Sequence, residues 1–328
     1  MAAGLPYWNP QNITFTILER IPGTHMPLAI QPFGILVATG VVIGAYLMRR
    51  WGEKHGLDDN HVRGLVLYSA IFGFTGAHLF DVIAYEPHKL VEDPLVLIRL
   101  WEGISSYGGF IGGSFGFFLY QRRNRLPFGP YGDCTIIGLV TAFTVGRLGC
   151  TVVHDHVGAA SDGFFLAVDY PVGKIPSFPA DASGLHHNLG LYEFLYLLFV
   201  CAVLYGASKW KDRPAGLLVA LSATVYAPVR FFLDYLRINP DADPRYLTLT
   251  FAQWASIATV GAGAFLIGRL VRSVRDTPAS EPATEDATPE TSKPAASKST
   301  TSKQGAGTAS ASKTGASKTG TTKRRKRK

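Results

Sequence analysis

The sequence predicts an all-α, polytopic membrane protein. Three observations lead to this fold class. Of the 328 residues, 47% are hydrophobic, the mean hydropathy is positive at +0.14, and long apolar runs recur along the chain. A helix that spans a bilayer needs about 20 mostly apolar residues, and soluble domains rarely contain such runs. We therefore expect a bundle of seven transmembrane helices, at approximately 30–48, 64–84, 104–120, 133–153, 190–207, 214–235 and 249–271.

The distribution of basic residues predicts the orientation of the bundle. Thirteen Lys and Arg residues follow the first, third, fifth and seventh spans, whereas the longer alternate segments hold only six. Because short loops rich in Lys and Arg stay in the cytoplasm, we expect the N-terminus outside and the C-terminus in the cytoplasm. The residues before the first span lack the basic start and the small-residue cleavage site of a secretory signal, so this span is expected to remain in the protein.

A change in composition divides the chain into two parts. Residues 1–275 hold the predicted bundle, whereas residues 276–328 are rich in Ala, Ser, Thr, Lys and Gly and end in KRRKRK. The second part contains no aromatic residue to bury, so it is expected to be disordered. It carries six of the eight net positive charges. A solvated tail is the simpler interpretation, and adhesion to anionic lipid or nucleic acid is the alternative.

Two arginines, Arg147 and Arg230, lie inside predicted spans, toward their outer ends. A charged side chain in hydrocarbon is costly, and it normally faces the bundle interior and an anion. Internal ion pairs are one interpretation, with Arg230 bound to Asp234 and Arg147 bound to Glu193 or Asp155. A clamp for a lipid phosphate is the other, because a guanidinium binds phosphate through two parallel hydrogen bonds.

Two further segments hold candidate site residues. Glycines between 103 and 116 permit close helix packing, or they leave room for a lipid or peptide beside Tyr107. The outer loop, 151–189, contains His154, His156 and His187. These histidines are expected to be solvated, to bind a metal, or to supply one proton acceptor, since imidazole titrates near neutral pH. The three cysteines have no metal-ligand spacing, and no metal is predicted.

These residues lie in motifs that resemble the prolipoprotein diacylglyceryl transferase family, across about 32–260. In order, the motifs are PFGIL, SYGGFIGG, GRLG, LYE, YAPVRFFLDYLR and LTFAQWASI. The resemblance implies a multi-pass enzyme of the bacterial inner membrane. It implies transfer of the diacylglyceryl group from phosphatidylglycerol to the thiol of a lipobox cysteine in a prolipoprotein signal peptide. It implies no cofactor.

The resemblance also suggests a role for individual residues. Arg147 and Arg230 match the two arginines that the family associates with the lipid phosphate, so they are predicted to act in catalysis and in substrate binding. The other residues predicted to bind substrate are Gly108, Gly109, His187, Tyr192, Glu193, Asp234 and Arg237.

One departure concerns the base that deprotonates the thiol. The family's proposed base, a histidine before the double glycine, is Tyr107 here, and a phenol that titrates near 10 is a poor base at neutral pH. We therefore expect His154, His156 or His187 to accept the proton, with Tyr107 still at the site. Two other hypotheses are a paralogue that uses the same lipid site with a different acceptor, and a non-catalytic lipid-binding membrane scaffold.

Overall fold

The computed structural model describes residues 4–9, 15–18, 28–99, 103, 105–175, 178–237 and 245–275 of the chain. The predicted tail, 276–328, lies outside the described residues. All features below belong to the unit that ends at Pro278.

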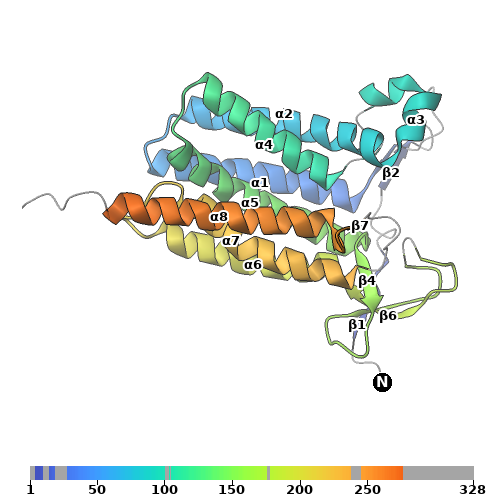
Figure 1. Ribbon diagram of the computed structural model, residues 1–328. Coiled ribbons are helices and arrows are strands. Elements are labelled where there is room, and N and C mark those ends of the chain that lie inside the picture. Colours follow the sequence, from blue (N-terminus) through green and yellow to red (C-terminus); the bar gives the residue numbers. More distant parts are fainter. Residues whose placement is uncertain are drawn as a thin grey trace, which may run out of the picture. The chain divides into compact units, whose positions relative to one another are not determined.

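Seven long helices lie side by side and form the described bundle (Figure 1). Their bounds are α1 Pro32–Lys54, α2 Asp59–Phe80, α4 Ser106–Arg123, α5 Phe128–Val153, α6 Leu189–Ser208, α7 Leu217–Leu233 and α8 Phe251–Arg275. Each corresponds to one predicted span, with ends that differ by a few residues. Six of them are long and apolar enough to cross a membrane. The helix outside this set is α4, which contains five glycines and ends in Arg122 and Arg123.

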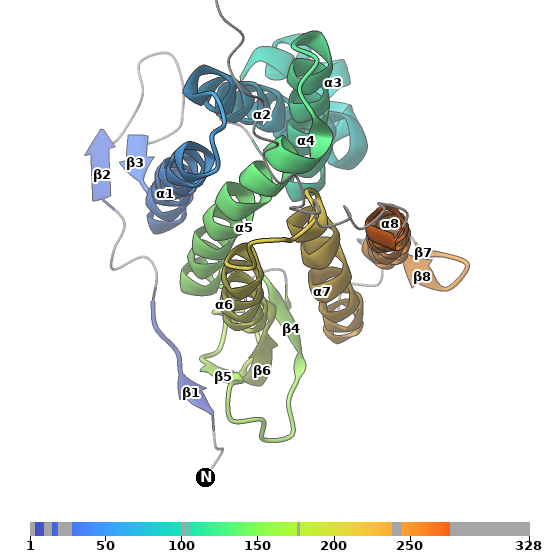
Figure 2. The same ribbon diagram turned by 90° about the vertical axis from the view of Figure 1, so that its left-hand side faces the viewer.

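The helices pack in pairs that are partly distant in the sequence. α2 lies against α4, α1 against α5, and α7 against α8, and α5 also contacts α6 (Figure 2). The α2–α4 contact explains part of the glycine pattern. A Cβ atom at Gly108 would lie 2.2 Å from the Gly76 carbonyl oxygen, and one at Gly112 would lie 2.1 Å from the Phe72 carbonyl oxygen. The expected close helix packing is therefore confirmed at Gly108.

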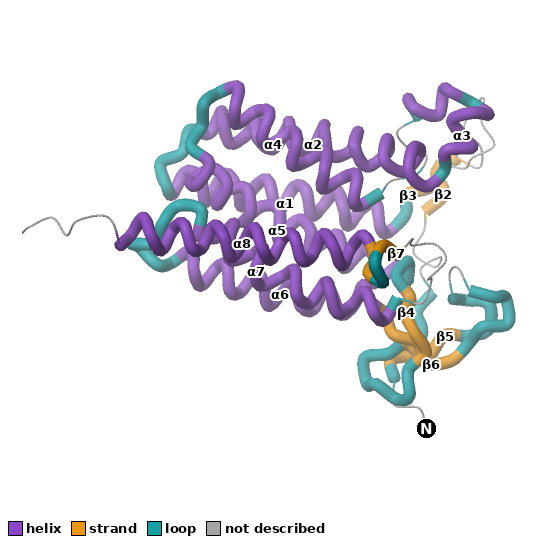
Figure 3. The backbone as a smooth tube through the Cα atoms, viewed as in Figure 1, coloured by secondary structure: helices purple, strands orange, loops and turns teal. Residues whose placement is uncertain are grey.

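Strands gather at one end of the bundle, where α1, α4, α6 and α8 begin (Figure 3). We call this end the sheet end, and the opposite end, where short loops join the helices, the loop end. A four-stranded sheet has the order β1-β5-β6-β4, with β1 Leu5–Pro6, β4 Val157–Ala160, β5 Val168–Tyr170 and β6 Gly184–Asn188. Two hairpins add β2 Phe15–Leu18 with β3 Leu28–Ile30, and β7 Arg245–Tyr246 with β8 Leu249–Thr250.

The segment 151–189 is more ordered than a solvated loop. Three strands of the sheet come from it, and β1 at the N-terminus pairs in parallel with β5. Val168, Tyr170 and Ile175 are buried and form a small hydrophobic core. The interpretation of residues 151–189 as a solvated loop is therefore wrong, because alternate residues of β5 point into this core.

Short helical turns complete the sheet end. A π-helical turn η2, Asp81–Tyr85, follows α2 and leads into α3 Pro87–Glu92 and the 3-10 turn η3 Pro94–Ile98. A second 3-10 turn, η4 Asp234–Leu236, follows α7. These turns lie at the same end as the sheet, so the polar residues near the ends of α5, α6 and α7 lie among ordered structure.

Candidate active site

Arg147 lies two turns before the end of α5, at the sheet end of the bundle. Its side chain is 7% exposed, and Nε lies 3.0 Å from Oε2 of Glu193 on α6, which is 6% exposed. The Nε hydrogen is not directed at this oxygen, so Nε has no hydrogen-bond partner among the described residues. Phe143, one turn earlier on α5, places its ring 5.1 Å from the guanidinium carbon. Arg147 is thus held by charge and by an aromatic face, with one N–H still unsatisfied.

Glu193 connects Arg147 to the second arginine. The hydroxyl group of Tyr226 on α7 donates a short hydrogen bond to Oε1 of Glu193. Arg230 lies four residues after Tyr226, one helical turn along α7, and Glu193 attracts its charge. The two arginines therefore lie around one buried carboxylate and do not point to different sides of the bundle.

Arg230 has a carboxylate of its own. Its Nη1 donates to Oδ1 of Asp234 at 3.2 Å, one turn away. Asp234 is buried, and Oδ2 accepts a short hydrogen bond from the Thr250 hydroxyl group. The Thr250 N–H donates to Oε1 of Gln253 at 3.0 Å, which ties this pair to the start of α8. Both ion pairs offered by the first interpretation of the sequence, Arg147–Glu193 and Arg230–Asp234, are present.

His156 faces Arg147 from the loop after α5. Its Nδ1 lies 2.5 Å from Oδ1 of Asp155, and its Nε2 lies 3.3 Å from Nη1 of Arg147. A carboxylate accepts and a guanidinium donates, so Nδ1 carries the hydrogen and Nε2 presents its lone pair. This arrangement is that of a general base oriented by a carboxylate.

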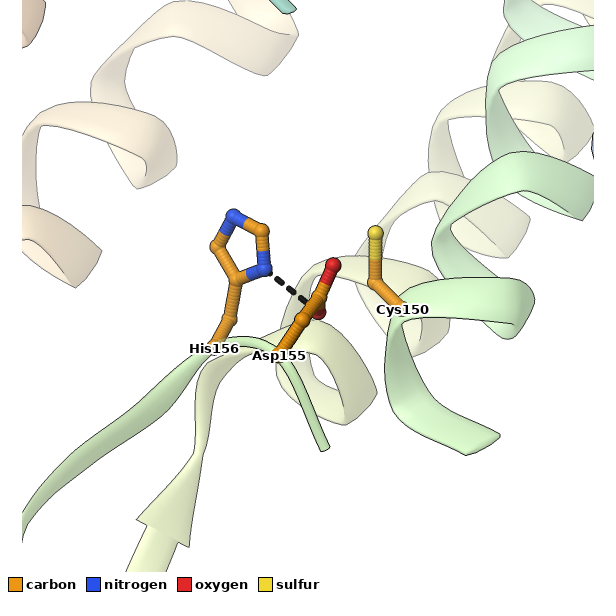
Figure 4. Close-up of side chains that lie close together, drawn as sticks. All are labelled: Cys150, Asp155 and His156. Atoms are coloured by element: carbon orange, nitrogen blue, oxygen red, sulfur yellow. Dashed lines mark hydrogen bonds and ion pairs between the residues drawn. The ribbon is translucent and has the colours of Figure 1, made fainter. Parts of the chain in front are cut away.

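Cys150 lies beside the same pair, as Figure 4 shows. Its sulfur and one ligand atom each of Asp155 and His156 lie within 4.8 Å of one another, a grouping that could hold a metal ion. However, Nη1 of Arg147 lies 3.5 Å from the Cys150 sulfur and 3.3 Å from His156. Because a cationic side chain already engages two of the three residues, we interpret the cluster as part of the hydrogen-bond network of Arg147.

A cavity of about 420 Å³ leads from these groups into the bundle. We call it the sheet-end cavity. It is lined by α1, α2, α4 and α5, and its polar end contains Arg147, Asp155 and His156. Its walls are mainly apolar and extend along the helices to Met48 and Leu65. An amphiphile with an anionic head and an apolar chain fits this distribution of polarity.

His154 does not line this cavity. It is 1% exposed, and its ring lies 4.9 Å from that of Tyr7 and 4.4 Å from that of Trp8. Nδ1 lies 3.0 Å from the Tyr170 hydroxyl group and Nε2 lies 2.9 Å from the Trp8 carbonyl oxygen. Burial lowers the pKa of His154. The structure thus places this histidine in the packing between the end of α5 and the sheet, away from the cavity.

The remaining sequence-predicted residues lie around the network. Nδ1 of His187 lies 2.8 Å from the Tyr192 hydroxyl group, under the ring of Phe164. Burial and the neighbouring His186 lower the pKa of His187. Neither His187 nor Tyr192 lines the sheet-end cavity.

Tyr107 and the glycines lie on two faces of α4. The Tyr107 ring lies 5.3 Å from that of Phe251, and Tyr107 interacts electrostatically with Arg230. Gly109 lines the sheet-end cavity and Gly108 does not. Arg237 follows η4, where its backbone N–H donates to the Asp234 carbonyl oxygen at 3.2 Å.

Sequence reasoning missed three members of the site. Tyr226 is part of the quoted YAPVRFFLDYLR motif, and its position four residues before Arg230 is a signal that could have found it. The sequence offers Asp155 as a partner for Arg147, and its place beside His156 also suggests a dyad. Cys150 has no comparable signal, since a lone cysteine in a span is ordinarily a packing residue.

Comparison with known proteins gives one consistent result. Residues 23–269 match the family model for prolipoprotein diacylglyceryl transferase. The phosphatidylglycerol–prolipoprotein diacylglyceryl transferases of Staphylococcus aureus strains MSSA476 and Newman are each 29% identical to this chain over 230 residues. The match covers 69% of this chain and 81% of each relative.

Proposed function

This chain belongs to the prolipoprotein diacylglyceryl transferase family, and from that membership we propose the reaction that it catalyses. It transfers the diacylglyceryl group of phosphatidylglycerol to the lipobox cysteine of a prolipoprotein. The bond between the glyceryl carbon and the phosphate oxygen breaks, a carbon–sulfur bond forms, and glycerol phosphate leaves. The observation that carries this proposal is the apolar cavity that ends at Arg147 and His156.

The proposed topology follows from the basic loops. All seven long helices cross the membrane, with α4 as the seventh, and the sheet end faces outward. Arg122 and Arg123 at the end of α4 then lie in the cytoplasm, as the positive-inside rule requires. The membrane is the bacterial plasma membrane, residues 1–275 form the transferase domain, and residues 276–328 form a cytoplasmic tail.

The two arginines bind the phosphate of the lipid. Its acyl chains enter the sheet-end cavity, which brings the phosphate to Arg147, whose Nε hydrogen has no acceptor in the described part of the chain. Arg230 approaches the same phosphate across Glu193. Negative charge grows on the leaving phosphate as the carbon–oxygen bond breaks, so the guanidinium groups stabilise the transition state more than the bound lipid.

His156 removes the proton from the acceptor thiol. A thiol has a reference pKa of about 8.5 and attacks as the thiolate. When Arg147 turns to the phosphate, it releases Nε2 of His156, which then accepts the thiol proton while Asp155 holds Nδ1. His187 and Tyr192 lie on the side where α6 begins, and we assign them to contacts with the signal peptide. Tyr107 lies near Arg230 and supports that arginine.

A rescue experiment tests the function. The chain is expressed in bacteria depleted of their own transferase, and conversion of a prolipoprotein is followed with growth. We expect rescue by the natural chain and by Arg122→Ala, an exposed control. We expect Arg147→Ala and Arg230→Ala to reduce transfer by about 10²–10³-fold, as for other lost oxyanion donors. Stable expression of the natural chain in the membrane without conversion would overturn the proposal.

A further inference from the structure

A second cavity, of about 760 Å³, opens near the loop end of the bundle. Residues of α1, α5 and α6 line it, and none of them lines the sheet-end cavity. We call it the loop-end cavity. Its apolar wall includes Leu47, Ile137, Val140 and Leu204. The wall therefore offers an apolar surface in the half of the bundle opposite the proposed active site.

The rim of the loop-end cavity carries excess positive charge. Arg50, Lys54 and Lys209 line it together with one carboxylate, Glu53. Glu53 lies 3.9 Å from Arg49, which is outside the cavity lining. Within the described ranges, the three rim cations make no ion pair. The rim is thus electrostatically suited to an anion.

Trp51 also lines the loop-end cavity. Its ring is stacked on His55 at 3.7 Å and lies 5.1 Å from the guanidinium carbon of Arg213. Nε1 is buried and has no acceptor among the described residues. Arg213 itself is engaged by the buried Asp133, at 2.6 Å. A tryptophan ring between an apolar wall and a basic rim is typical of the polar–apolar boundary of a lipid layer.

We propose that the loop-end cavity binds one anionic phospholipid from the adjacent leaflet. The phosphate lies among Arg50, Lys54 and Lys209, and an acyl chain lies along the apolar wall. Basic pockets between transmembrane helices on the cytoplasmic side are suited to such head groups. A soluble anion would leave the apolar wall uncovered, and a zwitterionic lipid would leave the rim charge uncompensated. With the proposed topology, this leaflet is the cytoplasmic one.

Native mass spectrometry of the full-length protein in detergent tests this proposal. The protein is titrated with dioleoyl phosphatidic acid, with dioleoyl phosphatidylcholine or with inorganic phosphate. The cavity variant is Arg50→Gln/Lys54→Gln/Lys209→Gln. The matched control, Arg122→Gln/Arg123→Gln/Arg272→Gln, makes the same change in charge at exposed positions of α4 and α8 outside the cavity lining.

We expect the cavity variant to raise the Kd for one phosphatidic acid by about tenfold or more, because each basic residue contributes on the order of 1 kcal/mol near an anionic surface. The control should change it by less than about twofold on the same scale. Arg147→Ala should still bind this phosphatidic acid in the loop-end cavity. This variant therefore distinguishes binding in the loop-end cavity from binding at the active site, whatever the outcome of the transfer assay. Equal losses in both triple variants, equal affinity for phosphatidylcholine, or displacement by inorganic phosphate alone would overturn the proposal.

Discussion

Replacing His156 with alanine should remove most of the transfer activity and leave the fold intact. The His156 side chain is 23% exposed, and its described polar contacts are those with Asp155 and Arg147. Loss of such hydrogen bonds at a partly exposed position costs about 0.5–1.5 kcal/mol of stability each. A general base contributes about 10²–10⁴-fold to a rate, which corresponds to about 2.7–5.4 kcal/mol in the barrier. The effect on activity should therefore exceed the effect on folding.

His154 provides the matched control, because it is two residues away and has the opposite environment. It is buried between Tyr7, Trp8 and Tyr170. Truncating a fully buried ring in a core costs about 3–5 kcal/mol for the largest aromatic residues, so His154→Ala should lower stability by a few kcal/mol. The protein that remains folded should still transfer, with a loss well below the about 10²-fold loss expected for His156→Ala.

The assay uses purified protein, phosphatidylglycerol and a fluorescent lipobox peptide, with thermal unfolding measured on the same samples. For His156→Ala we expect a rate at least about 10²-fold lower and a smaller loss of Tm than for His154→Ala. A variant that retains more than about a third of the rate, well above the range for a lost base, would refute the assignment of His156. Loss of activity that follows Tm in both variants would refute it as well.

Three further outcomes follow from the geometry. Glu193→Gln should destabilise the protein by about 3–5 kcal/mol, because it leaves Arg147 buried without an anion. Asp59→Asn, at an ion pair whose carboxylate is 31% exposed, should cost about 1 kcal/mol or less. Thermal unfolding compares the two variants, and equal losses would contradict the shared role of Glu193. Gly108→Ala should lower the free energy of unfolding by about 1–3 kcal/mol, because it forces α2 and α4 apart. Gly109→Ala, whose Cβ would meet Ala77 at 3.7 Å, should leave that free energy nearly unchanged. Chemical denaturation measures both variants, and a larger loss at Gly109 would contradict the packing. Burial lowers the pKa of His154 below its ordinary 6.5, so the unfolded chain binds more protons at this residue, and stability should fall as the pH drops below about 6.5. Unfolding measured between pH 7.5 and pH 5 should show a shallower loss of stability for His154→Asn than for the natural chain. An equally steep loss in this variant would count against His154 as the origin of the pH dependence.

The helices were predictable because each depends on a local property of the sequence. Runs of about 20 apolar residues mark the spans regardless of what they contact, and the four-residue spacing of Arg230 and Asp234 already places them on one face of a helix. The contact between Arg147 and Glu193 joins α5 to α6, and the Tyr226 hydrogen bond adds α7. No periodicity fixes which faces of separate helices meet. From the sequence, Glu193 is therefore only one of two possible partners for Arg147, the other being Asp155.

The histidines show a different limit. His154 and His156 are two residues apart, and both were candidates for the base. His154 has a left-handed backbone with φ 56° at the end of α5, an arrangement that non-glycine residues rarely adopt. This turn sends His154 toward the sheet and allows His156 to return to Arg147. His154 packs there against Tyr7 and Trp8, and the Trp8 carbonyl oxygen that it contacts is 146 residues away in the sequence. No local pattern could have indicated this contact.

The N-terminal strand has a practical consequence for work with this protein. Residues 5 and 6 pair with β5, and the Trp8 indole donates to the Val152 carbonyl oxygen at 3.1 Å. Affinity tags, fluorescent fusions or shortened versions that disturb the first ten residues would therefore weaken these contacts, which hold the turn that positions His156. A loss of activity in such a protein would reflect the lost N-terminal contacts and not a change in the residues that bind the lipid.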